Sequence, residues 1–369
     1  MKYKGIRHFL LIVLVFIMPR LTTAQRLEKG TAFSQYKFTP VYNAKKVGNT
    51  SIFQGNNETE KYFEGWYFKM VSHDGSSIIS VIPGISLPAD RKNQHAFIQI
   101  INGSTAQASY HSFPIGEFSY SRKEFAVKIG NNYFSKDSLV LNIQDSNASI
   151  TGKIKMTNTV DYKSGNSLVP GIMGWYRFVP FMQCYHGVVS LTHKLNGHLN
   201  INENSFNFDE GKGYLEKDWG KSMPSSWIWM QSNHFRDSSA SFMLSIADIP
   251  WLGNTFTGYL GFFYHNNKIH HFATYRDTKL HLNIAESNAL NIKIQTEKNI
   301  IILQAVSNNT ALLKAPQEGL MDRRIPESID ATIKITMYDS DGKVLIEDST
   351  KIAGLEMVGD YKHFQGLIK

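Results

Sequence analysis

The chain has 369 residues, of which 42% are hydrophobic and 12% aromatic, and its formal net charge is +8. The basic residues are scattered and do not form the kind of block that binds nucleic acid, so no nucleic-acid partner is expected. The positive charge indicates at most peripheral contact with an anionic membrane. The single cysteine, Cys184, cannot form an internal disulfide. Burial of apolar side chains must therefore stabilise the fold.

A targeting segment is expected at the N-terminus. Three basic residues lie among the first seven, and the apolar run that follows, residues 9–18, is too short to span a bilayer comfortably. Cleavage after Ala24 would make residues 1–24 a signal peptide and the mature chain secreted or periplasmic. An uncleaved membrane anchor is the alternative interpretation.

Most of the chain alternates apolar and polar residues with period two. A polar entry, residues 25–60, is expected to be irregular, and the later segments are separated by turn-forming pairs such as Asp74-Gly75 and Asn102-Gly103. No long stretch has helical periodicity, so we predict an all-β fold with little helix. The expected strands include residues 77–82, 96–101, 125–129, 139–143, 150–156, 241–246, 259–264, 290–294, 300–305 and 331–338.

Two segments, residues 66–83 and 227–250, resemble each other loosely. Each has an aromatic strand, a histidine near the turn, a Ser-rich return and an apolar exit to a proline. A duplication would give two lipocalin-like (calycin-like) antiparallel β-barrels or sandwiches in tandem, although the match needs a short insertion and leaves this open. The divide would fall in the Gly-, Pro- and Ser-rich residues 161–180, and we place the N-terminal lobe at 25–170 and the C-terminal lobe at 171–369.

Three aromatic-rich segments, residues 62–68, 175–185 and 227–229, could line an apolar cavity in such a fold. Strand alternation places Trp227 and Trp229 on the same face. The alternative for each ring is that it only fills the end of a barrel. The candidate ligand contacts are Glu64, Trp66, Tyr67, Trp175, Tyr176, Arg177, Tyr185, His186, Trp219, Trp227 and Trp229.

Residues 213–235 are the most informative stretch, because they combine charges with tryptophans in a chain that has few charged residues. On a strand, Glu216 and Asp218 would share one face and Lys217 would lie on the other. Two close carboxylates repel, so one can keep its proton near neutral pH, and burial raises a carboxyl pKa further. The stretch could thus supply an acid and a base to an apolar substrate, or it could be a loop with solvated charges.

Other polar residues have simpler interpretations. We expect Glu64 to form an ion pair, with Arg177 as a suggested partner, although it could also cap a barrel mouth or act chemically. His186 and His234 could carry protons, and structural roles are the alternative. No metal or other cofactor is expected, because neither the histidine spacings nor the glycines match a known binding motif.

Residues 62–70, 171–187 and 213–235 together resemble the tocopherol cyclase family, in particular its bacterial tocopherol cyclase-like branch. The similarity runs from about residue 62 to residue 360. It implies a lipocalin-like, all-β architecture. The residues that fall on the FEGWY and Glu-Lys-x-Trp-Gly elements of the family are Glu64, Gly65, Trp66, Tyr67, Glu216, Lys217, Trp219 and Gly220.

The resemblance also implies closure of a chroman ring on a prenylated quinol. A proton adds to the prenyl double bond, and the phenolic oxygen captures the tertiary cation. Such a reaction needs a buried acid, aromatic faces near the cation and exclusion of water. We therefore expect Glu216 to be the general acid, with Asp218 or His234 assisting proton return. Plant-type members have Asn at the position of Asp218, which favours Glu216 as the acid.

Two other functions fit the same sequence. A non-catalytic lipid or isoprenoid carrier would use the same kind of cavity. A terpenoid hydratase or isomerase would differ only in whether water reaches the cation. In each case the expected partner is a hydrophobic small molecule, and the expected extracytoplasmic location leaves the physiological substrate open.

Overall fold

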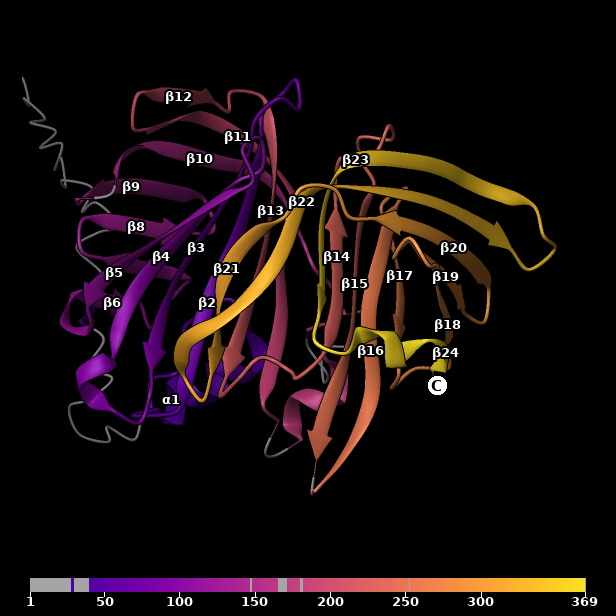
Figure 1. The fold of residues 1–369 in the computed structure, drawn as a ribbon, viewed down its shortest axis with the longest axis horizontal. Coiled ribbons are helices and arrows are strands. Elements are labelled where there is room, and N and C mark those ends of the chain that lie inside the picture. The colour runs from indigo at the N-terminus through magenta and orange to yellow at the C-terminus, as the bar shows by residue number, and fades with distance from the viewer. Residues whose placement is uncertain are drawn as a thin grey trace, which may run out of the picture.

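The computed structural model describes residues 28–29, 40–146, 148–164, 171–179, 182–251 and 253–368. The described residues form two large antiparallel sheets with one α-helix, so the predicted all-β class is confirmed (Figure 1). The expected signal peptide, residues 1–24, lies outside the described residues. Among those described, none of the helices has the length and apolar character needed to cross a bilayer.

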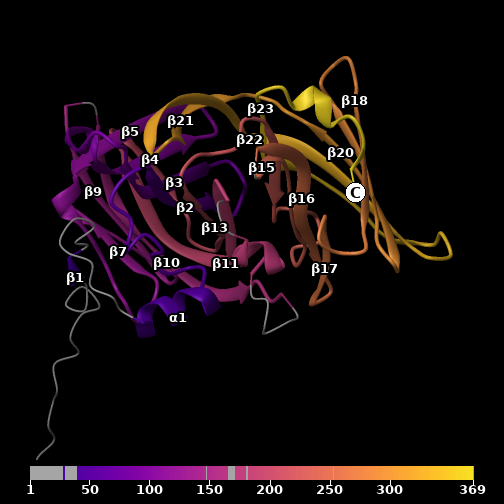
Figure 2. The same cartoon turned by 90° about the horizontal axis from the view of Figure 1, so that it is seen from below.

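The first sheet curls into a nearly barrel-shaped lobe, drawn in indigo to magenta in Figure 1 and seen from below in Figure 2. Strand β12 (Asn204–Asn207) pairs with β11 beside the main path. In sheet order the other strands are β1 (Glu28–Lys29), β6 (Phe118–Tyr120), β7 (Ala126–Ile129), β8 (Asn132–Ser135), β9 (Ser138–Gln144), β10 (Ser149–Asp161), β11 (Cys184–Ile201), β13 (Gly211–Gly220), β2 (Tyr62–Val71), β3 (Ile78–Leu87), β4 (His95–Asn102) and β5 (Gln107–Pro114).

The second sheet, drawn in orange to yellow, packs against the first along one face. Strand β21 (Ala311–Gln317) pairs with β22 beside the main path. In sheet order the other strands are β17 (Lys268–Ala273), β16 (Asn254–His265), β15 (Ser241–Trp251), β14 (Trp227–Ser232), β23 (Val344–Val358), β22 (Leu320–Asp339), β20 (Asn299–Val306), β19 (Leu290–Gln295), β18 (Lys279–Ile284) and β24 (Gly366–Ile368).

The change from one sheet to the other falls between Gly220 and Trp227, whereas we expected the lobes to divide at residues 170 and 171. Strands β11 and β13 follow the expected divide, yet β11 pairs with β10 and β13 pairs with β2. These long-range backbone hydrogen bonds complete the first lobe. A local change in composition, such as the one around residues 161–180, cannot reveal such pairing.

The polar entry is not wholly irregular, contrary to expectation. Part of it forms the helix α1 (Pro40–Gly48), whose last turn carries Lys45 and Lys46. Cations at this end suit the helix dipole. After the helix, Ile52 and Phe53 are buried in the core of the first lobe, so the entry belongs to the packed structure.

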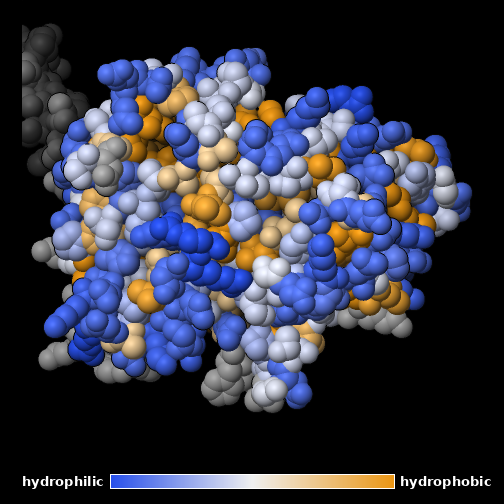
Figure 3. Space-filling view, viewed as in Figure 1, coloured by the Kyte–Doolittle hydropathy of each residue, from blue (hydrophilic) through white to orange (hydrophobic). Residues whose placement is uncertain are grey.

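Strand alternation divides the buried side chains among three clusters, one inside each lobe and one between the sheets. On β14, for example, Trp227 and Trp229 face the first sheet while Ile228 packs inside the second lobe. The face of the molecule seen in Figure 3 is mostly hydrophilic, and its apolar side chains appear in scattered groups. The layer between the sheets places aromatic rings such as Trp227 and Trp229 beside the buried carboxyl groups of Glu327 and Glu356.

Candidate functional site

A mainly apolar cavity of about 190 Å³ lies between the two sheets. The first sheet contributes wall residues from β2, β3, β4, β11 and β13, and the second contributes residues from β14 to β16 and β21 to β23. The site thus depends on the docking of the two lobes. Apolar wall residues include Phe63, Met173, Met182, Ile249, Leu260, Leu313 and Ile325.

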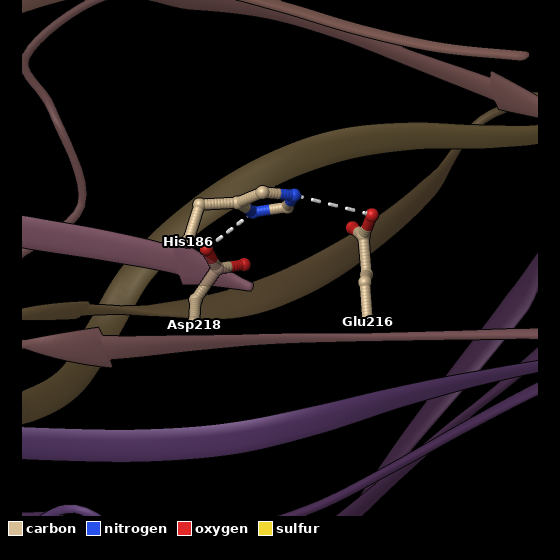
Figure 4. Close-up of side chains that lie close together, drawn as sticks. All are labelled: His186, Glu216 and Asp218. Atoms are coloured by element: carbon tan, nitrogen blue, oxygen red, sulfur yellow. Dashed lines mark hydrogen bonds and ion pairs between the residues drawn. The ribbon is translucent and has the colours of Figure 1, made fainter. Parts of the chain in front are cut away.

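His186, Glu216 and Asp218 form a polar triad in the cavity wall (Figure 4). Glu216 and Asp218 alternate along β13 and point the same way, as predicted, while His186 lies opposite Asp218 in the pairing of β11 with β13. The His186 Nδ1 atom is 2.8 Å from a carboxylate oxygen of Asp218, and Nε2 is 3.5 Å from Glu216. The imidazole therefore connects the two carboxylates.

The environment of the triad changes the protonation of its members. Burial lowers the pKa of His186, but attraction to Asp218 and Glu216 outweighs burial and raises it to about 9. Burial raises the pKa of Glu216 to about 7, against the opposing effect of His186. Tyr214 Oη donates a hydrogen bond of 2.6 Å to Glu216. At neutral pH, Glu216 can therefore carry a proton beside a cationic imidazole.

A second carboxyl pair, Glu327 and Glu356, lies in the wall on neighbouring strands of the second sheet. Tyr67 Oη donates a 2.7 Å hydrogen bond to Glu327 across the sheet boundary, and the Trp227 indole donates one to Glu356. Burial and repulsion from Glu356 raise the pKa of Glu327, and burial raises that of Glu356 to about 7. The pair therefore favours forms that retain a proton.

Sequence reasoning missed this second pair. Both residues take inward positions in an apolar alternation, Ile325-x-Glu327-x-Ile329 on β22 and Gly354-x-Glu356-x-Val358 on β23. A carboxylate at a position that the alternation assigns to the core was the available signal. It was overlooked because the two glutamates are far apart in the sequence and meet only when β22 pairs with β23.

The predicted tryptophan pair lies on the cavity wall. Trp227 and Trp229 both line it, and the ring of Tyr67 meets Trp229 edge-on at 5.5 Å between centroids. Within the described part of the chain, the indole Nε1 atom of Trp229 is buried without a hydrogen-bond partner. Indole faces attract a nearby cation, so this wall suits a positively charged intermediate.

Four residues of the family motifs point away from this cavity, into the first lobe: Glu64, Trp66, Lys217 and Trp219. Glu64 and Lys217 form a fully buried ion pair of 2.5 Å, and the Lys217 ammonium lies 4.8 Å from the Trp66 ring and 5.0 Å from the Trp219 ring. The suggested pairing of Glu64 with Arg177 is wrong. Lys217 reaches Glu64 because β13 pairs with β2, which places the residues on facing strands.

The entry segment covers this buried ion pair. Lys217 donates hydrogen bonds to the carbonyl oxygens of Thr50 and Ile52, and Glu64 accepts hydrogen bonds from the backbone of Gln54 and Gly55. These contacts satisfy both charges, which otherwise would be costly to bury. The geometry of this motif is therefore that of a structural element.

The remaining predicted contacts lie in a short helical turn and at the start of β11. Tyr185 lines the wall and stacks on Trp219 at 5.6 Å, while the Arg177 guanidinium lies 5.5 Å from the Trp219 ring and donates to the Lys46 carbonyl. Trp175 and Tyr176 lie in the short helical turn η4 (Gly174–Phe178). Neither Trp175 nor Tyr176 is among the described residues that line the cavity.

His234 also lies away from the described cavity wall. Burial and the neighbouring Lys69 and Lys212 hold its pKa well below the ordinary value, so the ring is neutral. Neither ring nitrogen has a hydrogen-bond partner within the described residues. His186 is consequently the better-placed histidine for proton transfer.

The triad is also the group of described residues whose geometry could accommodate a metal ion. One donor atom each from His186, Glu216 and Asp218 lie within 4.8 Å of one another. No spacing in the sequence indicates this arrangement, because the three donors meet only when β11 pairs with β13. The expectation of a metal-free site remains a prediction.

Together, the fold and the cavity define an all-β protein with a mainly apolar site that contains buried acids between two sheets. The chain belongs to the tocopherol cyclase-like family, whose model matches residues 121–359. The matched segment includes the triad and the Glu327–Glu356 pair, while residues 62–70 precede it. The family assignment made from the motifs is thus confirmed.

Two plant proteins are similar in sequence to parts of the chain. A probable chloroplastic tocopherol cyclase of Oryza sativa subsp. japonica is 22% identical over 198 residues, which cover 50% of this chain and 42% of that protein. A chloroplastic tocopherol cyclase of Zea mays is 28% identical over 74 residues, 20% of this chain and 16% of that protein. The chain thus matches less than half of either relative.

Solved structures resemble the chain with low sequence identity. CghA with Sch210972 has a TM-score of 0.49 and 8% identity, covering 81% of this chain and 89% of that one. Kievitone hydratase from Nectria haematococca has a TM-score of 0.45 and 13% identity, again covering 81% and 89%.

Proposed function

We propose that the protein is an enzyme that protonates a double bond of a prenylated phenol or related isoprenoid and closes a ring on the resulting cation. The observation that carries this proposal is the buried Glu216 carboxyl, next to His186, on the wall of a cavity that also presents Trp227 and Trp229. Membership of the tocopherol cyclase-like family supports the same reaction class.

Glu216 acts as the general acid in this proposal. Its proton adds to the less substituted carbon of the double bond, and a tertiary cation forms at the other carbon. The Glu216 carboxylate left behind is stabilised by the His186 imidazolium at 3.5 Å and by Tyr214. This stabilisation makes Glu216 a stronger acid when it transfers its proton than burial alone would allow.

Ring closure then returns the proton. The phenolic oxygen forms a bond to the cationic carbon and loses its proton to the Glu216 carboxylate, so the product is an isomer of the substrate. Asp218 holds the imidazole through Nδ1, which fixes the orientation of the Nε2 atom towards Glu216. Asp218 is thus a positioning residue. This role for His186 replaces the one considered for His234.

The cavity size limits which part of the substrate it encloses. A volume of about 190 Å³ is below the roughly 300–1,000 Å³ of common ligand pockets. It suits the reacting ring and the adjacent double bond, with the rest of the prenyl chain extending through the opening. Enclosure of the reacting atoms alone is sufficient to keep water from the cation.

Product analysis tests the proposal. Purified protein is incubated in D₂O with a short-chain prenylated hydroquinone, and the products are separated and their masses are determined by mass spectrometry. We expect a cyclic isomer with one deuterium bound to carbon. Recovery of the unaltered quinol bound to the protein would instead identify a carrier, and a product that had gained water would identify a hydratase.

A further inference from the structure

We propose that a cluster of mostly exposed aromatic side chains beside the cavity binds a lipid bilayer and admits the substrate from it. The identity of the substrate rests on the proposed function, whereas membrane binding can be tested without it. We call this cluster the aromatic rim, and it consists of the exposed Trp175, Phe178, Trp251 and Phe256 with the half-buried Tyr176.

The aromatic rim is unusually exposed for its residue types. The exposed fractions are 51% for Trp175, 52% for Phe178, 42% for Trp251 and 37% for Phe256. Tyr176 connects η4 to the β15–β16 hairpin, since its ring centroid lies 4.3 Å from that of Trp175 and 6.3 Å from that of Phe256. Trp175, Tyr176 and Phe256 are therefore neighbours, and Phe178 and Trp251 belong to the same turn and hairpin.

This surface is continuous with the cavity wall. Ile249 lines the cavity and lies opposite Phe256 in the pairing of β15 with β16, and Trp251 follows two residues later on the same face of the strand. Met173, immediately before η4, also lines the cavity. An apolar path thus leads from the exposed rings to the wall of the site.

The chemistry of the rim favours a lipid surface as its occupant. Tryptophan and tyrosine prefer the boundary between lipid headgroups and acyl chains, because each ring has an apolar body and a polar tip. The Arg276 guanidinium lies 5.8 Å from the Tyr275 ring, which in turn contacts Tyr176 at 5.5 Å, so a cation for lipid phosphates is adjacent. The cavity is too small to enclose a long prenyl tail, so the tail could remain in the bilayer while the reacting end of the substrate enters the site.

Flotation with lipid vesicles tests the inference on the full-length chain. We expect wild-type protein to float with phosphatidylcholine vesicles, and more strongly when phosphatidylglycerol is added. Trp251→Ser combined with Phe256→Ser should lower the partition constant about tenfold or more, because two rings no longer enter the interface. Val344→Ser combined with Leu345→Ser is the matched control, since these residues are 48% and 43% exposed.

The control turn between β22 and β23 lies at the right edge of Figure 1, away from the β15–β16 hairpin at the lower edge. Quenching of tryptophan fluorescence by brominated lipids provides a second measurement on the unaltered protein. Failure of the wild-type protein to bind either vesicle, or equal loss in both double variants, would overturn the inference. A dimer that only the Trp251→Ser/Phe256→Ser variant abolishes, without vesicle binding, would assign the rim to a second copy instead.

The vesicle result is separable from the catalytic proposal. Glu216→Gln lies inside the cavity, so this variant should float like the wild-type protein. Vesicle binding without ring closure would therefore refute the proposed reaction alone. Ring closure of detergent-dispersed substrate without vesicle binding would refute the membrane surface alone.

Discussion

Replacing Glu216 with Gln removes the proposed proton donor while keeping its shape. The amide oxygen can still accept the hydrogen bond from Tyr214, and the side chain remains buried at 3% exposure. The variant should therefore bind an apolar ligand almost as well as the wild-type protein. It should not protonate a double bond, because an amide is not a useful acid at neutral pH.

The expected loss follows from the role of the carboxyl group. General acid catalysis contributes about 10²–10⁴-fold to a rate, which corresponds to about 3–5 kcal/mol of activation free energy. In the wild-type protein the pKa of Glu216 is raised to about 7, so kcat/KM should fall as the pH rises through that value. The residual activity of the variant should lack this dependence.

The same pKa shift has a consequence for stability. Between its ordinary pKa of 4.5 and the folded value of about 7, the native state retains a proton that the unfolded chain has lost. This carboxyl group therefore destabilises the wild-type fold as the pH rises through that interval. The stability of Glu216→Gln relative to wild type should increase over the same interval, as measured by urea unfolding.

Two measurements are made on each variant. Product formation from a short-chain prenylated hydroquinone reports turnover, and the fluorescence of the cavity tryptophans reports ligand binding. Glu203→Gln, an exposed residue, is the matched control and should behave as wild type. Equal turnover by Glu216→Gln and wild type would remove Glu216 from the mechanism. Loss of ligand binding together with turnover would mean that the carboxyl group positions the substrate instead of protonating it.

Three further variants test neighbouring parts of the structure. His186→Gln removes the cation that lowers the pKa of Glu216, so the maximal rate should fall and the alkaline limb of the pH–rate profile should move to higher pH; an unmoved limb would contradict the coupling. Lys217→Met leaves Glu64 buried without its partner and should cost about 3–5 kcal/mol in urea unfolding, with partial recovery when Glu64→Gln is added; no loss would contradict the buried pair. Gly354→Ala places a methyl group 2.6 Å from the Trp229 ring, so it should lower the free energy of unfolding by about 1–3 kcal/mol and weaken ligand binding measured by fluorescence; unchanged stability and binding would contradict the close contact.

Part of the site could be predicted from the sequence because a strand has a fixed period of two. Once residues 213–220 are a strand, Glu216 and Asp218 must share a face and Lys217 must take the other. The same rule placed Trp227 and Trp229 together. Alternation does not say what each face meets, and this is why Glu64 was given the wrong partner.

The sequence by itself determined the all-β class, the family and the grouping of residues on strand faces, because these depend on local periodicity and on motif residues that are close along the chain. Tertiary structure alone decided that β13 pairs with β2 and that the second sheet covers its face. Because of this pairing and packing, Lys217 contacts Glu64, and His186, Glu216, Glu327 and Glu356 line one cavity. Contacts between residues far apart in sequence depend on which sheets pair and pack, and a single strand does not contain that information.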